Sequence, residues 1–79
     1  MKVRLFARAR ELAGADIIDV DLPSGATVGE LRRLIAETHP RLASLLERSA
    51  LAVNDEFADD TLTLPLQAEV AVLPPVSGG

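Results

Sequence analysis

Cysteine, tryptophan and tyrosine are absent from this chain, and histidine occurs once. Without thiols the protein can form neither disulfides nor a metal site with thiolate ligands. The single histidine, His39, stands before Pro40, and one imidazole cannot complete a metal site alone. We interpret His39 as a residue at a helix end rather than as a catalyst. The chain is therefore expected to hold no metal and no cofactor of its own.

Aromatic residues and positive charge are also scarce. Phe6 and Phe57 are the only aromatic residues, and the formal net charge is −4. Proteins that bind nucleic acids stack bases on aromatic rings and neutralise phosphates with basic side chains, so we expect no nucleic-acid partner. No apolar run approaches the roughly 20 residues that cross a bilayer, so we expect no membrane partner and a cytoplasmic location.

What the chain does contain is typical of one ordered domain of 79 residues, of which 48% are hydrophobic and 25% charged. Periodicity and turn residues predict a strand, a short helix, a strand, a long helix, a second short helix, a tight hairpin and a final strand. We expect these elements at residues 2–7, 8–13, 16–22, 28–39, 41–47, 51–57 and 69–73. The predicted class is α+β, a mixed sheet of about five strands with helices on one face, as in the ubiquitin-like β-grasp.

The long helix carries a recognisable start signal. Thr27 and Glu30 form a predicted capping box, in which the Thr27 hydroxyl accepts from the Glu30 N–H and the Glu30 carboxylate accepts from the Thr27 N–H. Apolar residues recur at helical spacing and should face the core. They are Val28, Leu31, Leu34 and Ile35. Arg32 is expected on the solvent side of this helix.

The first strand and the hairpin predict which side chains leave the core. In the first strand Val3, Leu5 and Ala7 should point inward, and Arg4 and Phe6 should point to the opposite face. Residues 54–55, Asn-Asp, tolerate the positive φ values of a two-residue hairpin turn.

This turn fixes the hairpin register. It sets Val53 opposite Glu56 and places Ala52 and Phe57 together on the outer face of the sheet. Alternation in the last strand points Leu73 to that face too. We hypothesise that Phe6, Phe57 and Leu73 form a docking patch for a partner protein; the alternative is that each packs locally beneath a loop.

The last six residues, 74–79, are predicted to form an extended tail outside the 1–73 domain. Pro74 and Pro75 lack backbone donors and therefore stop the preceding strand. Gly78 and Gly79 have no side chains, so they could enter a narrow tunnel of a partner. Fully extended, the segment could carry the Gly79 carboxylate roughly 20 Å from the domain. The alternative is a frayed terminus or an expression remnant.

Four segments of the chain together resemble the sulfur carrier subunits, or small subunits, of molybdopterin synthases. They are Leu5–Gly14, Gly25–Leu31, Ala52–Asn54 and Val70–Gly79. One departure lies at residues 66–68, where the family usually has an acidic-Gly-acidic turn and this chain has Leu-Gln-Ala. If the family's glycine uses a positive φ, Gln67 must either be strained or sit in a rebuilt turn.

The resemblance implies a function for the tail. A ubiquitin-activating-like enzyme would use ATP to convert the Gly79 carboxylate to a glycyl adenylate, and a sulfur donor such as a cysteine desulfurase or rhodanese would convert that to a thiocarboxylate. The large synthase subunit would receive the tail and use its sulfur to build the dithiolene of molybdopterin from cyclic pyranopterin monophosphate. This chain would be a non-catalytic subunit of a heterotetramer. The residues implied at the partner's site are Phe6, Phe57, Leu73, Pro74, Pro75, Val76, Ser77, Gly78 and Gly79.

Three alternatives stay open on sequence alone. A thiamine-type sulfur carrier also ends in Gly-Gly, a ubiquitin-like modifier would be joined through Gly79 to lysines of target proteins, and a plain interaction module would carry an inert tail. Lys2 is the only lysine, which disfavours long self-linked chains.

Overall fold

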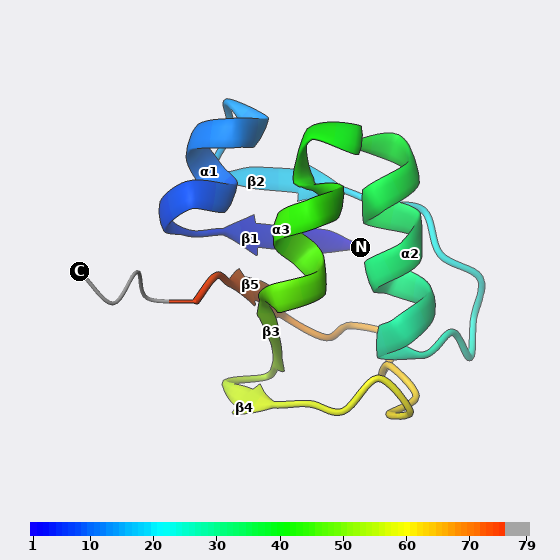
Figure 1. Ribbon diagram of the computed structural model, residues 1–79. Helices are drawn as coiled ribbons and strands as arrows, with labels where there is room; N and C mark the ends of the chain where they lie inside the picture. Colours follow the sequence, from blue (N-terminus) through cyan, green and yellow to red (C-terminus); the bar gives the residue numbers. More distant parts are fainter. Residues whose placement is uncertain (76–79) are drawn as a thin grey trace.

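The computed structural model describes residues 1–75 and contains a five-stranded mixed sheet covered by helices (Figure 1). The elements in chain order are β1 (Lys2–Leu5), α1 (Ala7–Ala13), β2 (Ile17–Asp19), α2 (Val28–Thr38), the 3-10 helix η1 (Pro40–Leu42), α3 (Ala43–Arg48), β3 (Ala50–Val53), β4 (Glu56–Phe57) and β5 (Val70–Leu73). The strand order is β2-β1-β5-β3-β4, with β1 parallel to β5 and the other pairs antiparallel. The predicted fold class is confirmed.

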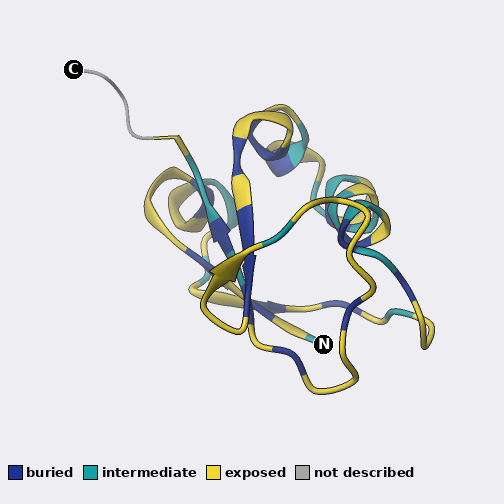
Figure 2. Ribbon diagram, turned by 90° about the horizontal axis from the view of Figure 1, so that it is seen from below, coloured by how far each residue is buried: buried dark blue, intermediate teal, exposed yellow. Residues whose placement is uncertain are grey.

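All three α-helices lie on one face of the sheet, and no helix within residues 1–75 covers the other face (Figure 2). The core fills the space between the two layers and draws on nearly every element. Its fully buried large side chains are Val3, Leu5, Val28, Leu31, Ile35, Leu42, Leu46, Leu51, Val70 and Val72. The inward faces predicted for β1, α2 and β5 are therefore confirmed, with Leu34 only partly buried.

The first strand is shorter than predicted. It ends at Leu5, and Ala7 is exposed and begins α1 instead of pointing into the core. The Phe6 carbonyl accepts the N–H of Ala9 at 3.0 Å. The chain is therefore already in its first helical turn at Ala7, where the alternating sequence pattern predicted that the strand continues. Ala7 has a φ of 50°, a left-handed conformation that costs an L-residue about 1–2 kcal/mol. At the other end of α1, Gly14 ends the helix in a left-handed conformation with a φ of 71°.

The backbone N–H groups at the N-terminus of α2 are hydrogen-bonded to neighbouring segments of the chain. Thr27 Oγ1 accepts the N–H of Glu30 at 3.2 Å, but the Glu30 carboxylate meets the Thr27 hydroxyl at 3.4 Å instead of the Thr27 N–H. Of the two hydrogen bonds predicted for the capping box, the one from the Glu30 N–H to the Thr27 hydroxyl is confirmed, and the one from the Thr27 N–H to the Glu30 carboxylate is wrong. The first two N–H groups of the helix donate to the carbonyls of Leu62 and Asp60, each at 2.9 Å. The free donors of this helix end are thus satisfied within the protein.

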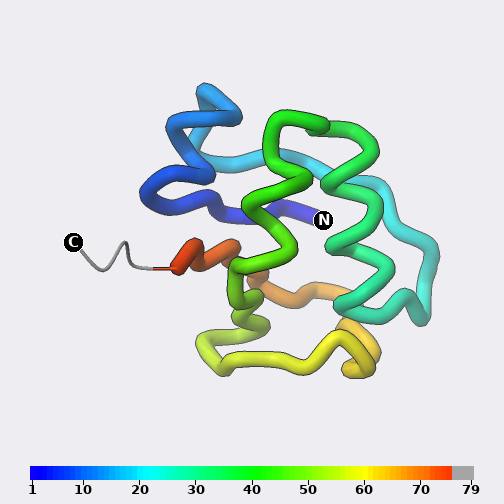
Figure 3. The backbone as a smooth tube through the Cα atoms, in the orientation of Figure 1, coloured from blue at the N-terminus to red at the C-terminus, as the bar shows by residue number. Residues whose placement is uncertain are grey.

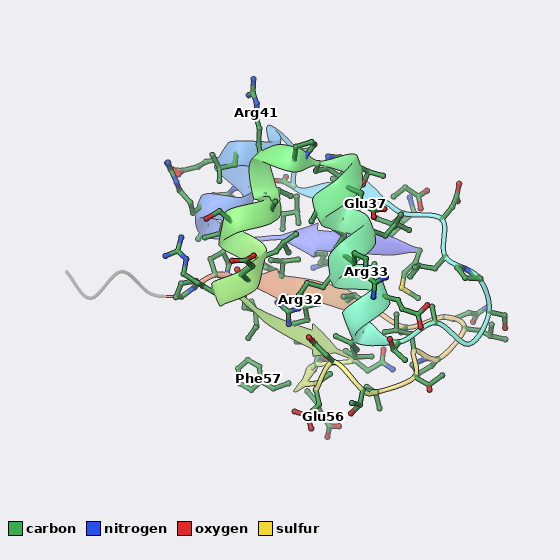
Figure 4. All side chains as sticks on the ribbon, turned by 45° about the vertical axis from the view of Figure 1, so that its right-hand side comes forward. Arg32, Arg33, Glu37, Arg41, Glu56 and Phe57 are labelled. Carbon is green, nitrogen blue, oxygen red and sulfur yellow. The ribbon has the colours of Figure 1, made fainter. Side chains whose placement is uncertain are left out.

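Arg32 does not lie on the solvent side as predicted. Its side chain is only 21% exposed and connects three segments (Figure 4). Arg32 Nη1 donates to the carbonyls of Leu46 and Ser49 at the end of α3, the latter at 2.8 Å. Nη2 and Nε donate to Asp60 Oδ1 at 3.0 and 3.2 Å. The partners come from segments far apart in sequence, so helical periodicity contained no sign of them.

Arg32→Ala is expected to lower the free energy of unfolding by about 2–3 kcal/mol. The reason is that the change leaves the α3 carbonyls without their charged donor and releases Asp60. Urea denaturation of the purified variant measures the loss. Arg33→Ala is the matched control, because Arg33 is the adjacent residue on α2, is exposed and points away from the sheet (Figure 4). Equal stability of the two variants would contradict this role of Arg32.

The hairpin between β3 and β4 has the predicted turn and register. Residues 54–55 have φ values of 50° and 68°, and the paired residues are Val53 with Glu56 and Ala52 with Phe57. The turn at residues 66–68 is rebuilt: Gln67 does not have a positive φ, and the Ala68 N–H donates to the carbonyl of residue 65 at 3.3 Å. Of the two alternatives predicted for Gln67, the rebuilt turn is therefore the correct one, and its backbone is not strained by a positive φ.

Candidate functional site

The first and last strands end at the same edge of the sheet. They run parallel, with Leu5 beside Val72, so their carboxyl ends lie together, and Figure 3 shows the blue and red segments side by side. Continuing this register places Phe6, the next residue after β1, beside Leu73 at the end of β5. Pro74 follows at once. The tail segment therefore starts next to Phe6.

One row of residues crosses the uncovered face from edge to edge. The pairing partners in this row are Ile17 on β2, Arg4 on β1, Ala71 on β5, Ala52 on β3 and Phe57 on β4. In β2, β1, β5 and β3 the neighbours of these residues along the strand are core residues, so alternation points the row away from the helices. Both residues of β4 are exposed, and Phe57 joins the row through its pairing with Ala52. Ile17 is 47% and Phe57 78% exposed, while Ala52 is buried. Four of the five side chains are apolar.

The three residues predicted as a docking patch lie on this face, but not all side by side. Phe6 is 41% exposed and adjoins the partly buried Leu73. Phe57 stands on the edge strand β4, and β3 separates it from β5. In Figure 4 its ring projects away from the body of the domain. The face is continuous through Ala52, whereas the role of these residues in docking stays a prediction.

The tail residues are described only in part. Pro74 is partly buried and Pro75 is exposed. The predicted site residues Val76, Ser77, Gly78 and Gly79 lie outside the described residues. Their roles therefore stay predictions from the sequence.

Arg4 lines three shallow hollows, two of which it shares with Phe6. A hollow of about 300 Å³ is lined by Arg4, Leu5, Phe6, Arg10, Asp16 and Ile17. A second, of about 150 Å³, is lined by Arg4, Phe6, Ala52, Asp55, Glu69, Val70 and Ala71. Arg10 Nε lies 3.8 Å from Asp16 Oδ1, whereas Arg4 takes part in none of the ion pairs formed within residues 1–75. The alternation of β1 placed Arg4 beside Phe6, but nothing in the sequence indicated its apolar surroundings.

The chemistry available on the described part of the chain is that of recognition. Within residues 1–75 no group of three or more His, Cys, Asp or Glu side chains could hold a metal ion. His39 is the C-cap of α2, as its interpretation at a helix end predicted. No helix in this part of the chain is long and apolar enough to cross a membrane. An exposed apolar face beside the start of the tail is thus the main functional feature.

Comparisons with known proteins cover nearly the whole chain. The model of the ThiS family matches residues 3–79. A molybdopterin synthase sulfur carrier subunit from Dictyostelium discoideum is 41% identical over 99% of this chain and 94% of its own length.

Two solved structures share the fold. The crystal structure of small archaeal modifier protein 1 from H. volcanii has a TM-score of 0.85 and 31% identity, over 96% of this chain and 97% of that chain. A complex of subunits 1 and 2 of the molybdopterin-converting factor from Helicobacter pylori contains a chain with a TM-score of 0.69 and 26% identity, over 99% of this chain and 96% of that chain.

Proposed function

This chain belongs to the ThiS family, and on that premise we propose that it is the sulfur carrier subunit of a molybdopterin synthase. The observation that carries the proposal is the 41% identity, over nearly its full length, to a relative named as such a subunit. That name also favours molybdopterin over a thiamine-type carrier. The chain would work as a non-catalytic subunit, and the acids and bases of the reaction would belong to its partner.

The proposed chemistry takes place at the carboxylate of Gly79. A carboxylate oxygen attacks the α-phosphorus of ATP on an adenylating enzyme and releases pyrophosphate, because the resulting mixed anhydride has a good leaving group that a carboxylate lacks. The sulfur of hydrosulfide then attacks the acyl carbon, AMP departs with the former carboxylate oxygen, and loss of the S–H proton leaves a thiocarboxylate. The large subunit transfers this sulfur to cyclic pyranopterin monophosphate. ATP is consumed on the adenylating enzyme, and this chain needs no metal.

The geometry of the sheet supports delivery of the tail. A partner that covers the outer face would contact Phe6 and Leu73 at the point where the tail segment begins. Gly78 has no side chain and would let the tail pass through a narrow tunnel of that partner. The complex of subunits 1 and 2 from Helicobacter pylori supports a large subunit as that partner. We propose a heterotetramer with two carriers on a large-subunit dimer, located in the cytoplasm.

Intact-mass measurement tests the proposal. The purified chain is incubated with ATP, the adenylating enzyme of the same organism and hydrosulfide. Replacement of oxygen by sulfur at the activated carbonyl should add ~16 Da, and omission of ATP should prevent the gain. An unchanged mass in the complete mixture would contradict the proposal.

A second candidate function is covalent modification of proteins. It is favoured by the similarity to small archaeal modifier protein 1. In this reaction the activated Gly79 would form isopeptide bonds with lysines of target proteins, and AMP would again be the leaving group. The same incubation with added cell proteins distinguishes the two, because conjugation produces adducts of high mass instead of a gain of ~16 Da.

A further inference from the structure

Arg4 is the one charged residue in an otherwise apolar row that crosses the outer face. Its register partners on the outer face are Ile17 on one side and Ala71 on the other. Phe6 lies two residues further along and on the same face, and both residues line the same two hollows. Any protein that covers Phe6 therefore covers Arg4 as well.

No carboxylate of this chain neutralises Arg4 among the described residues. Arg10 shares the larger hollow, but it is already paired with Asp16 at 3.8 Å. Asp55 and Glu69 line the smaller hollow with Arg4, and no ion pair joins either carboxylate to Arg4. Since a guanidinium stays charged at any physiological pH, Arg4 brings a full, unpaired charge to the face.

Covering this charge imposes a condition on the partner. Burying an arginine at an interface without a hydrogen-bonding partner is strongly unfavourable, because the guanidinium loses its hydration. A carboxylate on the partner protein offsets this cost, and proteins that lack such a carboxylate bind less well. We infer that Arg4 selects the large synthase subunit by pairing with a carboxylate which that subunit presents to the centre of the face. The hollow of about 300 Å³ beside Arg4 has room for an inserted side chain, and Asp16 on its wall is already paired with Arg10. The inference rests on the proposed function.

The test compares two arginine-to-methionine variants. Arg4→Met removes the charge and keeps a long apolar stem, and Arg41→Met makes the same change on η1, on the helical side of the molecule (Figure 4). Affinity for the purified large subunit of the same organism is measured by calorimetry in 0.15 M salt. At this concentration the Debye length is about 8 Å, so interactions between exposed charges farther apart than this are largely screened. Arg4→Met should weaken binding about 30-fold or more, because it leaves the partner's carboxylate buried and unpaired. Arg41→Met should change the affinity by less than about two-fold.

The result that overturns the inference is equally definite. Without a facing carboxylate, Arg4→Met should bind as tightly as the unaltered chain or more tightly, since no guanidinium must lose its water; a loss below about five-fold counts as this outcome. Arg4→Glu, with Arg41→Glu as its charge-matched control, provides a second pair and should bind more weakly than Arg4→Met through repulsion. Normal binding by Arg4→Met refutes the inference alone, whereas failure of the unaltered chain to bind the large subunit refutes the docking on which the proposed function depends.

Discussion

Deletion of Gly79 is expected to reduce sulfur transfer to the pterin precursor by at least about 100-fold while leaving the stability of the domain unchanged. The truncated chain still ends in a carboxylate, but that group is set back by one residue, or about 3.4 Å along an extended chain. A misplacement of about 1 Å at a reacting centre can already cost 100-fold in rate. Formation of the dithiolene by the reconstituted synthase, followed by mass spectrometry of the product, measures the loss.

Two controls accompany this deletion. Arg33→Ala changes an exposed residue of α2, on the helical side of the domain, so it should retain sulfur transfer within a few-fold. Thermal unfolding should be the same for both variants and the unaltered chain, because the core cluster lies entirely between Val3 and Val72 and does not include Arg33. Transfer by the truncated chain at the normal rate would show that Gly79 does not carry the sulfur.

Phe6→Ala is expected to weaken binding to the large subunit by about 30-fold or more, a loss typical of an aromatic hot spot. Phe6 has the position that such a residue needs, since it is partly exposed, adjoins Leu73 and stands where the tail begins. Calorimetric titration of the large subunit with each carrier variant measures the change.

The matched control is Leu66→Ala. Leu66 is 81% exposed, but it lines a hollow with Met1 at the opposite end of β1. Its removal should leave the affinity nearly unchanged. Equal losses for both variants would indicate a non-specific apolar effect, and no loss for Phe6→Ala would remove Phe6 from the interface. Urea denaturation of each variant shows whether the fold is retained.

Local signals in the sequence predicted the local structure well. Asn54 and Asp55 specify their own turn, and the turn fixes the pairing of Val53 with Glu56. The error at Ala7 is local, because α1 begins where the alternation of β1 would continue. The error at Arg32 arose because distant segments decide the outcome. Arg32 has a solvent-side position on the helical wheel, yet carbonyls at the end of α3 and the Asp60 carboxylate draw it inward.

The candidate site was predictable to a similar extent. Alternation within β1 and β5 placed Phe6 and Leu73 on the uncovered face, because each strand has its own buried side. That these strands are neighbours, and that Arg4 lies between Ile17 and Ala71, depends on a strand order that no local pattern encodes. The position of the Arg4 charge between two apolar neighbours could therefore be found only from the structure.

The pairing of β1 with β5 has a consequence for how the protein is made. These two strands are neighbours in the centre of the sheet, although one is synthesised first and the other last. Contacts of such long sequence separation form late, since the intervening chain must first be brought together at an entropic cost. On the ribosome the sheet cannot close before β5 has emerged. The domain therefore acquires its native structure only after β5 has been synthesised, and a product that lacks β5 remains unfolded and exposed to proteolysis.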